Sequence, residues 1–236
     1  MWKFLCNKEK REQEDGGTDE KRTNRCSKQI YKSHMKKVEE LITTSLKELL
    51  ELRCITNING ATKSKLVYPL KQDGTRRISK QEGKLIFIKQ IDQDGEYYYS
   101  VKAPTRKKYV STGSVAMLEN IDVCLYEEGK RKHLVKFLAF NPRQITYTKD
   151  FETLFTDEDG LDNYFIHLLQ KANKGTLMNV ENKYTEAIER VREKYNGFHS
   201  RLKIFLCEID EKRISKYEVD ENGELSAPEE VYKSEE

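Results

Sequence analysis

Residues 119–142 read E-N-I-D-V-C-L-Y-E-E-G-K-R-K-H-L-V-K-F-L-A-F-N-P, and this stretch decides the fold. Two apolar runs, Ile121–Tyr126 and Leu134–Phe140, flank a charged turn with a central glycine, which is the pattern of a hairpin of two buried strands. Each run contains one ionisable residue, Asp122 in the first and Lys136 in the second. A buried charge is costly unless it is paired or binds a metal, so function is first sought at these two positions.

The same stretch predicts how the two strands pair. A hairpin that reverses at Gly129 places Glu127 opposite Arg131, and the same register places Asp122 opposite Lys136 on one face. We therefore expect these two charges to neutralise each other inside the sheet. The alternative is that Asp122 is a relic of a metal site.

The length and composition of the chain fit one domain with extensions. A chain of 236 residues with 36% hydrophobic content can bury one sizeable core. Residues 7–28 are almost wholly polar and residues 220–236 are acidic, so we expect disorder at 1–28 and 220–236 and a folded domain over 29–219. The opening hexapeptide, Met1–Cys6, is interpreted as a frayed terminus, with contact to a membrane or a partner as the alternative.

Hydrophobic periodicity predicts helices and strands that alternate along most of the domain. The expected helices cover residues 30–54, 79–92, 145–155 and 180–195. The expected strands outside the hairpin cover residues 97–103, 109–112, 164–169, 204–209 and 214–219, and Pro104 and a basic turn separate the first two. A helix ahead of the strand at 164–169 favours parallel pairing. The expected fold is α/β, with a mixed central sheet flanked by helices, an N-terminal helix and a C-terminal helix-hairpin extension.

Net charge, cysteines and hydropathy exclude several classes of protein. Lys and Arg number 43 and Asp and Glu number 40, so the net charge of +3 does not by itself indicate nucleic acid or an anionic membrane. Five cysteines without a C-x-x-C spacing argue against a disulfide framework and a zinc knuckle. No apolar run approaches the roughly 18 residues of a membrane span. We expect a cytoplasmic protein with no membrane span.

Three basic clusters are the candidate nucleic-acid interface, and they comprise Arg76, Arg77, Arg106, Lys107, Lys108, Lys130, Arg131 and Lys132. If the clusters meet at one end of the sheet, they form a positive rim for phosphates, and tyrosines at 97, 98, 99 and 109 add stacking. The alternative is that each cluster is a solvated turn. His133 and His167 lack triad partners at a recognisable spacing, and His167 is predicted to be a hydrogen-bonded core residue.

The order of the expected elements resembles the restriction-endonuclease-like superfamily, which is known by its PD-(D/E)xK motif. The resemblance covers residues 76–170. It is carried by Arg77-Ile-Ser-x-Gln-Glu82, Tyr97-Tyr-Tyr-Ser-Val, Pro104-Thr-x-Lys-Lys-Tyr109, Ile121-Asp-Val-x-Leu-Tyr126 and Ala139-x-Asn-Pro142. It implies a Glu on the first helix, an Asp on the second strand, and a carboxylate two residues before a Lys on the third strand, which together hold Mg²⁺ and activate a water.

This chain departs from that pattern on the third strand. Lys136 and Leu138 stand where the family has its carboxylate and lysine, whereas Glu82 and Asp122 remain. Glu82 also has a structural explanation, because Ser79-x-x-Glu82 is a capping box. Replacing a metal ligand by an ammonium removes a donor and adds repulsion, so we expect no catalysis and no cofactor. The turn sequence Glu128-Gly-Lys130, although an E-x-K, is interpreted as a solvated turn.

The resemblance implies an inactive nuclease-fold protein that acts as a nucleic-acid-binding or complex-assembly subunit in a bacterial defence system. Its expected partners are DNA or RNA and either a protein partner or a second copy of the chain. One alternative is an active Mg²⁺-dependent nuclease that uses Asp122 and Glu82 with an acid from elsewhere. The other is a pure protein-interaction subunit.

Overall fold

The structure is a computed structural model that describes residues 37–54, 65–110, 116–198, 200–220 and 222–234. The chain divides into two units, Met1–Glu39 and Glu40–Glu236, and the second contains the sheet. The segment 1–28, for which we predicted disorder, lies outside the described residues. No helix in the described part of the chain is long and apolar enough to cross a membrane.

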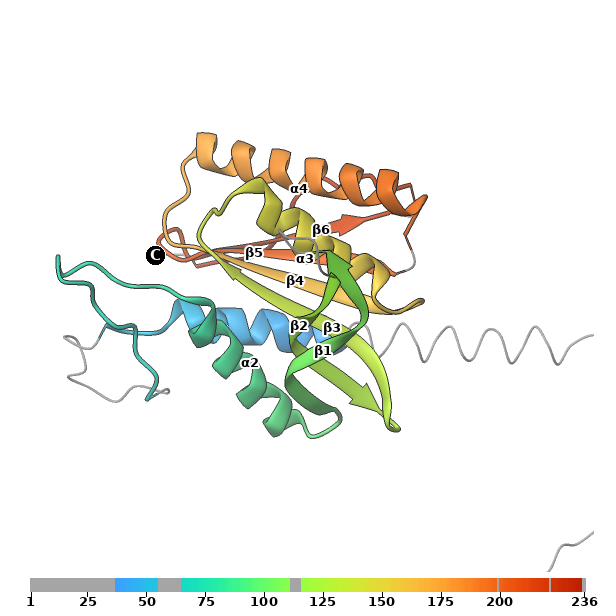
Figure 1. The fold of residues 1–236 in the computed structure, drawn as a ribbon. Helices are drawn as coiled ribbons and strands as arrows, with labels where there is room; N and C mark the ends of the chain where they lie inside the picture. The colour runs from blue at the N-terminus through green and yellow to red at the C-terminus, as the bar shows by residue number, and fades with distance from the viewer. Residues whose placement is uncertain (1–36, 55–64, 111–115, 199, 221, 235–236) are drawn as a thin grey trace, which may run out of the picture. The chain divides into compact units, whose positions relative to one another are not determined.

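The second unit is an α/β structure built on one mixed sheet (Figure 1), as predicted. Its seven strands lie in the order β1-β2-β3-β4-β5-β6-β7. The β3–β4 and β4–β5 pairs are parallel and the other pairs are antiparallel. The strands are β1 (Tyr98–Val110), β2 (Ala116–Glu127), β3 (Lys130–Ala139), β4 (Asp162–Leu169), β5 (Arg201–Glu208), β6 (Arg213–Val219) and β7 (Glu229–Lys233). The helices that the structure delimits in full are α2 (Lys80–Asp94), α3 (Gln144–Thr156) and α4 (Lys174–Tyr195), and residues 40–50 are also helical.

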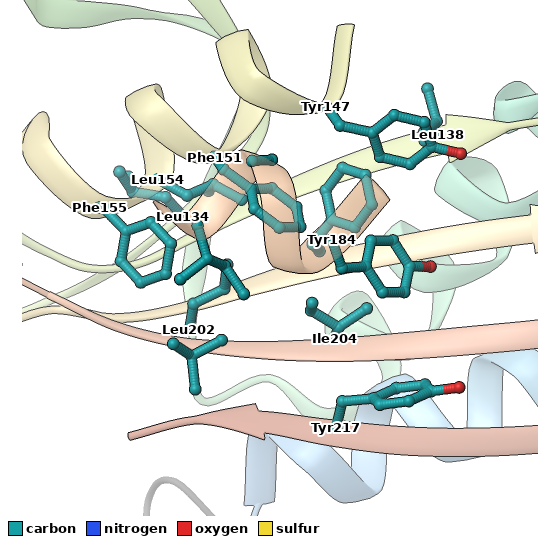
Figure 2. Close-up of a cluster of buried hydrophobic side chains, with 14 of the residues drawn as sticks. Leu134, Leu138, Tyr147, Phe151, Leu154, Phe155, Tyr184, Leu202, Ile204 and Tyr217 are labelled. Carbon is teal, nitrogen blue, oxygen red and sulfur yellow. The ribbon is translucent and has the colours of Figure 1, made fainter. Parts of the chain in front are cut away.

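Helices cover both faces of the sheet (Figure 1). On one face, aromatic and aliphatic side chains of α3 and α4 pack onto the middle strands, and Figure 2 shows part of this core. It includes Leu134, Tyr147, Phe151, Tyr184, Ile204 and Tyr217. On the other face α2 approaches closely, because a Cβ at Gly83 would lie 3.1 Å from Leu168 Cδ1. Every residue of β4 is buried, as expected of a strand covered on both faces.

The start of α2 confirms the predicted capping box. The Ser79 side chain accepts a hydrogen bond from Gln81 N, and Glu82 Oε2 accepts from Ser79 N at 3.0 Å. Gly95, with a φ of 73°, ends the helix in the left-handed conformation. The capping box fixes the position of the N-terminus of α2, which lies beside the candidate site.

Strand β1 differs from the prediction, because it continues through Pro104 to Val110 instead of ending before a basic turn. Its register with β2 shifts between Pro104 and Lys108, which marks a bulge. β1 lies at the edge of the sheet, where the missing N–H of a proline is tolerated. Asp157 Oδ1 accepts hydrogen bonds from the N–H groups of Arg106 and Lys107 at 2.8 and 2.9 Å, so the irregular segment is held from outside the strand.

The C-terminal part also differs from the prediction. β5 and β6 do not form an extension separate from the sheet, because β5 pairs in parallel with β4 and β6 pairs with β5 in the same sheet. Within the predicted acidic tail, β7 pairs with the outer edge of β6. An ion pair of 2.9 Å between Lys216 and Glu229 links these two strands. Without β7 this edge of β6 would have unpaired backbone groups, and β7 pairs with them. The acidic composition of the tail does not reveal this partner.

Candidate functional site

The candidate site begins where β2 and β3 diverge. Their antiparallel pairing extends through the pair Val123–Val135. Past that pair, the N–H of Phe137 donates to Asp122 Oδ2 at 3.0 Å, so a side-chain carboxylate takes the position of a strand partner. β2 still pairs with β1 and β3 still pairs with β4 in this region, and the two strands therefore form a fork within the sheet.

A cavity of about 610 Å³ lies at the fork, between the N-terminus of α2 and the side of α3. Its walls combine charged side chains with apolar ones. The residues that line it include Ser79, Lys80, Glu119, Asn120, Asp122, Lys136, Leu138, Phe140, Ile145, Lys149, Asp150 and Glu152. Asp122, Lys136 and Leu138, the strand positions that the sequence singled out, thus line one cavity.

Two ammonium groups of α2 surround the carboxylate of Asp122. Lys80 Nζ lies 3.0 and 3.2 Å from its two oxygens, and Lys84 Nζ lies 3.7 Å from Oδ1. Lys80 and Lys84 are one helical turn apart and therefore project from the same face of α2. The side chains of Lys84 and Asp122 are 9% and 11% exposed, so these two groups are largely shielded from water, whereas the side chain of Lys80 is 42% exposed.

Lys136 has a different partner from the predicted one. Its Nζ lies 2.6 Å from Asp150 Oδ1 of α3, and its side chain is 5% exposed. The predicted ion pair between Lys136 and Asp122 is therefore wrong. The register next to these residues is as predicted, but the strands separate there, and a helix on each side supplies the counter-charge.

Nearer the turn the predicted register is wrong. Glu127 pairs with Lys130, not with Arg131, because the register shifts between Leu125 and Tyr126. Gly129 has a φ of 74°, as a tight reversal requires, and Glu128 also has a positive φ of 49°. Glu128 and Lys130 are exposed, as expected for a solvated turn.

Glu82 is not among the residues that line the cavity. Its Oε2 accepts hydrogen bonds from the backbone N–H and the hydroxyl of Ser79, at 3.0 and 2.6 Å. Glu82 thus stabilises the start of α2, and through it the position of Lys80. This is the structural role that the capping-box pattern indicates.

The residues at the fork do not fit a Mg²⁺ ion. Magnesium takes oxygen ligands, but the oxygens of Asp122 already contact two ammonium groups and one backbone N–H. On β3, Lys136 brings an ammonium group and Leu138 an alkyl chain to the cavity, and neither can be a ligand of Mg²⁺. Among the described residues there is no group of three or more His, Cys, Asp or Glu arranged to hold a metal.

The basic clusters do not form one rim. Arg131 donates to Pro104 O at 2.8 Å and contacts Asp157 at 3.4 Å, so the second and third clusters meet. Arg76 instead contacts Asp210 at 3.9 Å. Asp157 precedes β4 and Asp210 follows β5, and since these strands are parallel, the two sites lie at opposite ends of the sheet.

Individual basic residues differ in how available they are to a ligand. Arg131, with an 11% exposed side chain, is a structural partner of buried Asp157. Arg106 contacts Glu158 at 3.1 Å and Lys132 contacts Glu127 at 3.4 Å. The exposed members are Arg77, Arg106, Lys107, Lys108 and Lys130. Of the predicted stacking tyrosines, Tyr97 and Tyr109 are buried, Tyr99 is partly exposed and Tyr98 is 79% exposed.

Two histidines lie in the core, as predicted for His167. Its Nε2 donates to the carbonyl of Phe140, so in the neutral ring Nδ1 accepts from the Tyr184 hydroxyl at 2.7 Å. Complete burial lowers the pKa of His167 to about 4, which keeps the ring neutral at physiological pH. Burial also lowers the pKa of His133, whose Nδ1 lies 2.9 Å from Asp162 O.

The sequence analysis did not identify Lys80, Lys84, Lys149 or Phe140 as site residues. Lys80 lies within the capping box Ser79–Glu82 and Lys84 lies two residues after it. Their spacing of four residues, which places both side chains on one face of a helix, was the signal that the sequence offered. Lys149 contacts Glu119 at 2.7 Å across the cavity wall. Phe140 lies in the cavity wall with a φ of 67°, which no sequence pattern indicates.

A scan against protein-family models, a search of curated proteins and a search of solved structures each found no match. A functional assignment for this chain therefore rests on its own residues and geometry.

Proposed function

We propose that this chain is a catalytically inactive protein of the restriction-endonuclease-like class that binds nucleic acid as a subunit of a larger assembly. The observation that carries the proposal is the environment of Asp122, which two lysines of α2 neutralise at the fork between β2 and β3. The bacterial defence setting is part of the proposal and rests on the sequence resemblance.

The element order supports the class. The succession α2, β1, β2, β3, α3, β4, α4 is the one that the resemblance implies, and the capping box of α2 and the Asp of β2 fall where it implies them. The cavity then lies at the place where a nuclease of this class would gather its carboxylates. Here the lining combines four acidic residues with three lysines, and Lys84 adds a further ammonium group beside Asp122.

The charge arrangement supports the absence of metal-dependent cleavage. Lys80 and Lys84 together bring two positive charges to Asp122, the charge that a divalent cation would bring. A cation that entered would have to displace both ammonium groups and lose part of its hydration shell, with Lys136 repelling it from β3. Mg²⁺ gives up water reluctantly, so this exchange is unfavourable.

The exposed lysines of β1 support binding of a polyanion. Lys107 and Lys108 are exposed, and Lys108 pairs with Leu118, the neighbour of the cavity residue Glu119. The basic part of β1 therefore lies one strand away from the part of β2 that lines the cavity. Because single strands and duplexes both carry dense phosphate charge, contact at these lysines requires no particular sequence.

The test is fluorescence anisotropy with labelled single- and double-stranded DNA and RNA in EDTA, from 50 to 200 mM salt. The variant is Lys107→Ala with Lys108→Ala. A matched control, Lys71→Ala with Lys233→Ala, removes two exposed lysines that lie away from β1. Each lost phosphate contact flattens the slope of log K against log salt by about 0.9 for duplex DNA, so the β1 variant should flatten it by about 2 and the control should not.

Three results would contradict the proposal. Absence of binding to any nucleic acid at 50 mM salt would remove the binding function and favour a protein-interaction subunit. Cleavage of DNA or RNA by the wild type in Mg²⁺ or Mn²⁺, abolished by Asp122→Asn, would show an active nuclease. Equal salt slopes for the wild type and the β1 variant would place the interface elsewhere.

A further inference from the structure

Phe140 is the most unusual residue of the cavity. Five non-glycine residues in the described part of the chain have a positive φ, and Phe140 is the aromatic one among them; the others are Lys102, Glu128, Asn196 and Lys212. A bulky side chain in the left-handed region is a real conformational outlier. Phe140 is 49% exposed, so its burial does little to offset this strain.

The surrounding structure fixes the backbone of Phe140 in this conformation. Its N–H donates to Leu168 O at 3.0 Å, and its carbonyl accepts from His167 Nε2. His167 is itself held by the Tyr184 hydroxyl at 2.7 Å. Contacts from β4 and α4 thus maintain a strained residue whose side chain is left half exposed. Strain that a structure maintains in this way points to a use for the side chain outside the fold.

The neighbours of Phe140 at the cavity indicate what the ring would contact. Ile145, at the start of α3, is 54% exposed and also lines the cavity. Lys80 and Lys149 line it with side chains that are 42% and 39% exposed, whereas Lys136 is 5% exposed. The accessible part of the cavity therefore combines an aromatic ring, an aliphatic side chain and two ammonium groups.

Lys80 and Lys149 each have a carboxylate partner, Asp122 at 3.0 Å and Glu119 at 2.7 Å. An ammonium group has three N–H donors, so one carboxylate does not exhaust either lysine. Both can donate to a further oxygen without leaving a carboxylate unpaired. The deeper pair, Lys136 with Asp150, is less accessible and serves to stabilise the wall.

From this juxtaposition we propose that the cavity binds one nucleotide unit, with its base stacked on Phe140 beside Ile145 and its phosphate contacted by Lys80 and Lys149. The inference deepens the proposed function and rests on it. A volume of about 610 Å³ lies within the range of pockets for small ligands, roughly 300 to 1,000 Å³. The shared ligand chemistry is a nucleoside phosphate, supplied either by a strand or by a free nucleotide.

The test compares Phe140→Leu, which keeps an apolar side chain but removes the aromatic ring, with Phe140→Trp, which keeps a stacking surface. Leu85→Ala is the control, because Leu85 is 53% exposed on α2 and does not line the cavity. Each protein is titrated by anisotropy with a labelled ten-nucleotide single strand, with a strand of equal length whose sites are all abasic, and with thymidine and adenosine monophosphates as competitors. Thermal melts establish that every variant is folded.

Stacking of one base on an aromatic ring predicts that Phe140→Leu lowers affinity for the ordinary strand by about 5- to 150-fold. The abasic strand should bind the wild type and Phe140→Leu equally, and Phe140→Trp should bind the ordinary strand like the wild type. If monophosphates compete at concentrations similar to those of the strand, the ligand of the cavity is a free nucleotide. If they compete only weakly, the ligand of the cavity is a nucleotide unit of the strand.

The inference and the proposed function fail in different ways. If the strand binds and Phe140→Leu equals the wild type and Leu85→Ala, the inference is wrong and the proposed function stands. If no strand binds but a monophosphate does, and Phe140→Leu abolishes that binding, the proposed function is wrong and the cavity is a site for free nucleotides only. If neither binds the wild type, both are wrong.

Discussion

Acidification should weaken the fold through His167. The ring is completely buried on β4, with Tyr184 of α4 at Nδ1, the Phe140 carbonyl at Nε2 and the ring of Tyr147 of α3 at 5.6 Å between centroids. Burial lowers the pKa of His167 to about 4, and the nearby charge of Lys183 acts in the same direction. In the unfolded chain the same ring has a pKa of about 6.5.

The sign and size follow from this difference. Between pH 6.5 and about 4 the unfolded chain binds a proton at residue 167 and the folded chain does not, so acidification favours unfolding. One pKa unit corresponds to about 1.36 kcal/mol. His167 therefore removes about 3 kcal/mol from the unfolding free energy as the pH falls from above 6.5 to about 4, and nothing further below that.

Urea unfolding followed by circular dichroism at several pH values from 7.5 to 4 measures this effect. The comparison is between the wild type and His167→Gln, whose side chain does not titrate. The variant loses stability at neutral pH, but its unfolding free energy should fall by about 3 kcal/mol less across the interval. His133 has a pKa that burial lowers too, and it is present in both proteins, so its contribution cancels. Parallel pH profiles for the two proteins would refute the reasoning.

Two further predictions concern the cavity. Lys136→Met and Asp150→Asn should each destabilise the fold by up to about 3 to 5 kcal/mol, and the double variant should cost less than the sum of the two, with a coupling energy of about 0.5 to 3 kcal/mol in urea unfolding. A larger coupling of Lys136 with Asp122 than with Asp150 would contradict the observed pairing. Phe140→Gly should keep the unfolding free energy within about 1 kcal/mol of wild type, because the released left-handed strain of about 1 to 2 kcal/mol offsets the entropy cost of glycine. A loss above about 2 kcal/mol would show that the ring stabilises the fold.

Features that depend on local sequence were predictable. The hairpin followed from two apolar runs around a glycine, and the start of α2 followed from Ser79 and Glu82 at the spacing of a capping box. The buried strand β4 was predicted from a continuous apolar run. That both ring nitrogens of His167 have hydrogen-bond partners was expected from its place in that run. Each of these depends on neighbours within a few residues or on burial alone.

Features that depend on distant partners were not predictable. The nearest charge to Asp122 is Lys80, 42 residues earlier in the chain, and the bulge of β1 is held by Asp157, some 50 residues later. The position of Gly129 predicted the register of the pair Val123–Val135, but neither the register shift near the turn nor the point at which the strands separate. Likewise, hydrogen bonds with Leu168 and His167 hold the backbone of Phe140 in the left-handed conformation, which a phenylalanine rarely adopts.

The pairing of charges around the fork determines how a ligand would be held. The charges nearest the fork, Asp122 and Lys136, are largely buried and are paired with side chains of the flanking helices, so neither side chain is available for direct contact with a ligand. Binding energy then has to come from the accessible groups: lysines of β1 and of the cavity wall for phosphates, and Phe140 for a base. The first contribution weakens as salt rises, because it depends on counterion release, whereas stacking does not. Salt titration of Phe140→Leu beside the β1 variant therefore separates the two contributions on a single chain, and a chelator should affect neither.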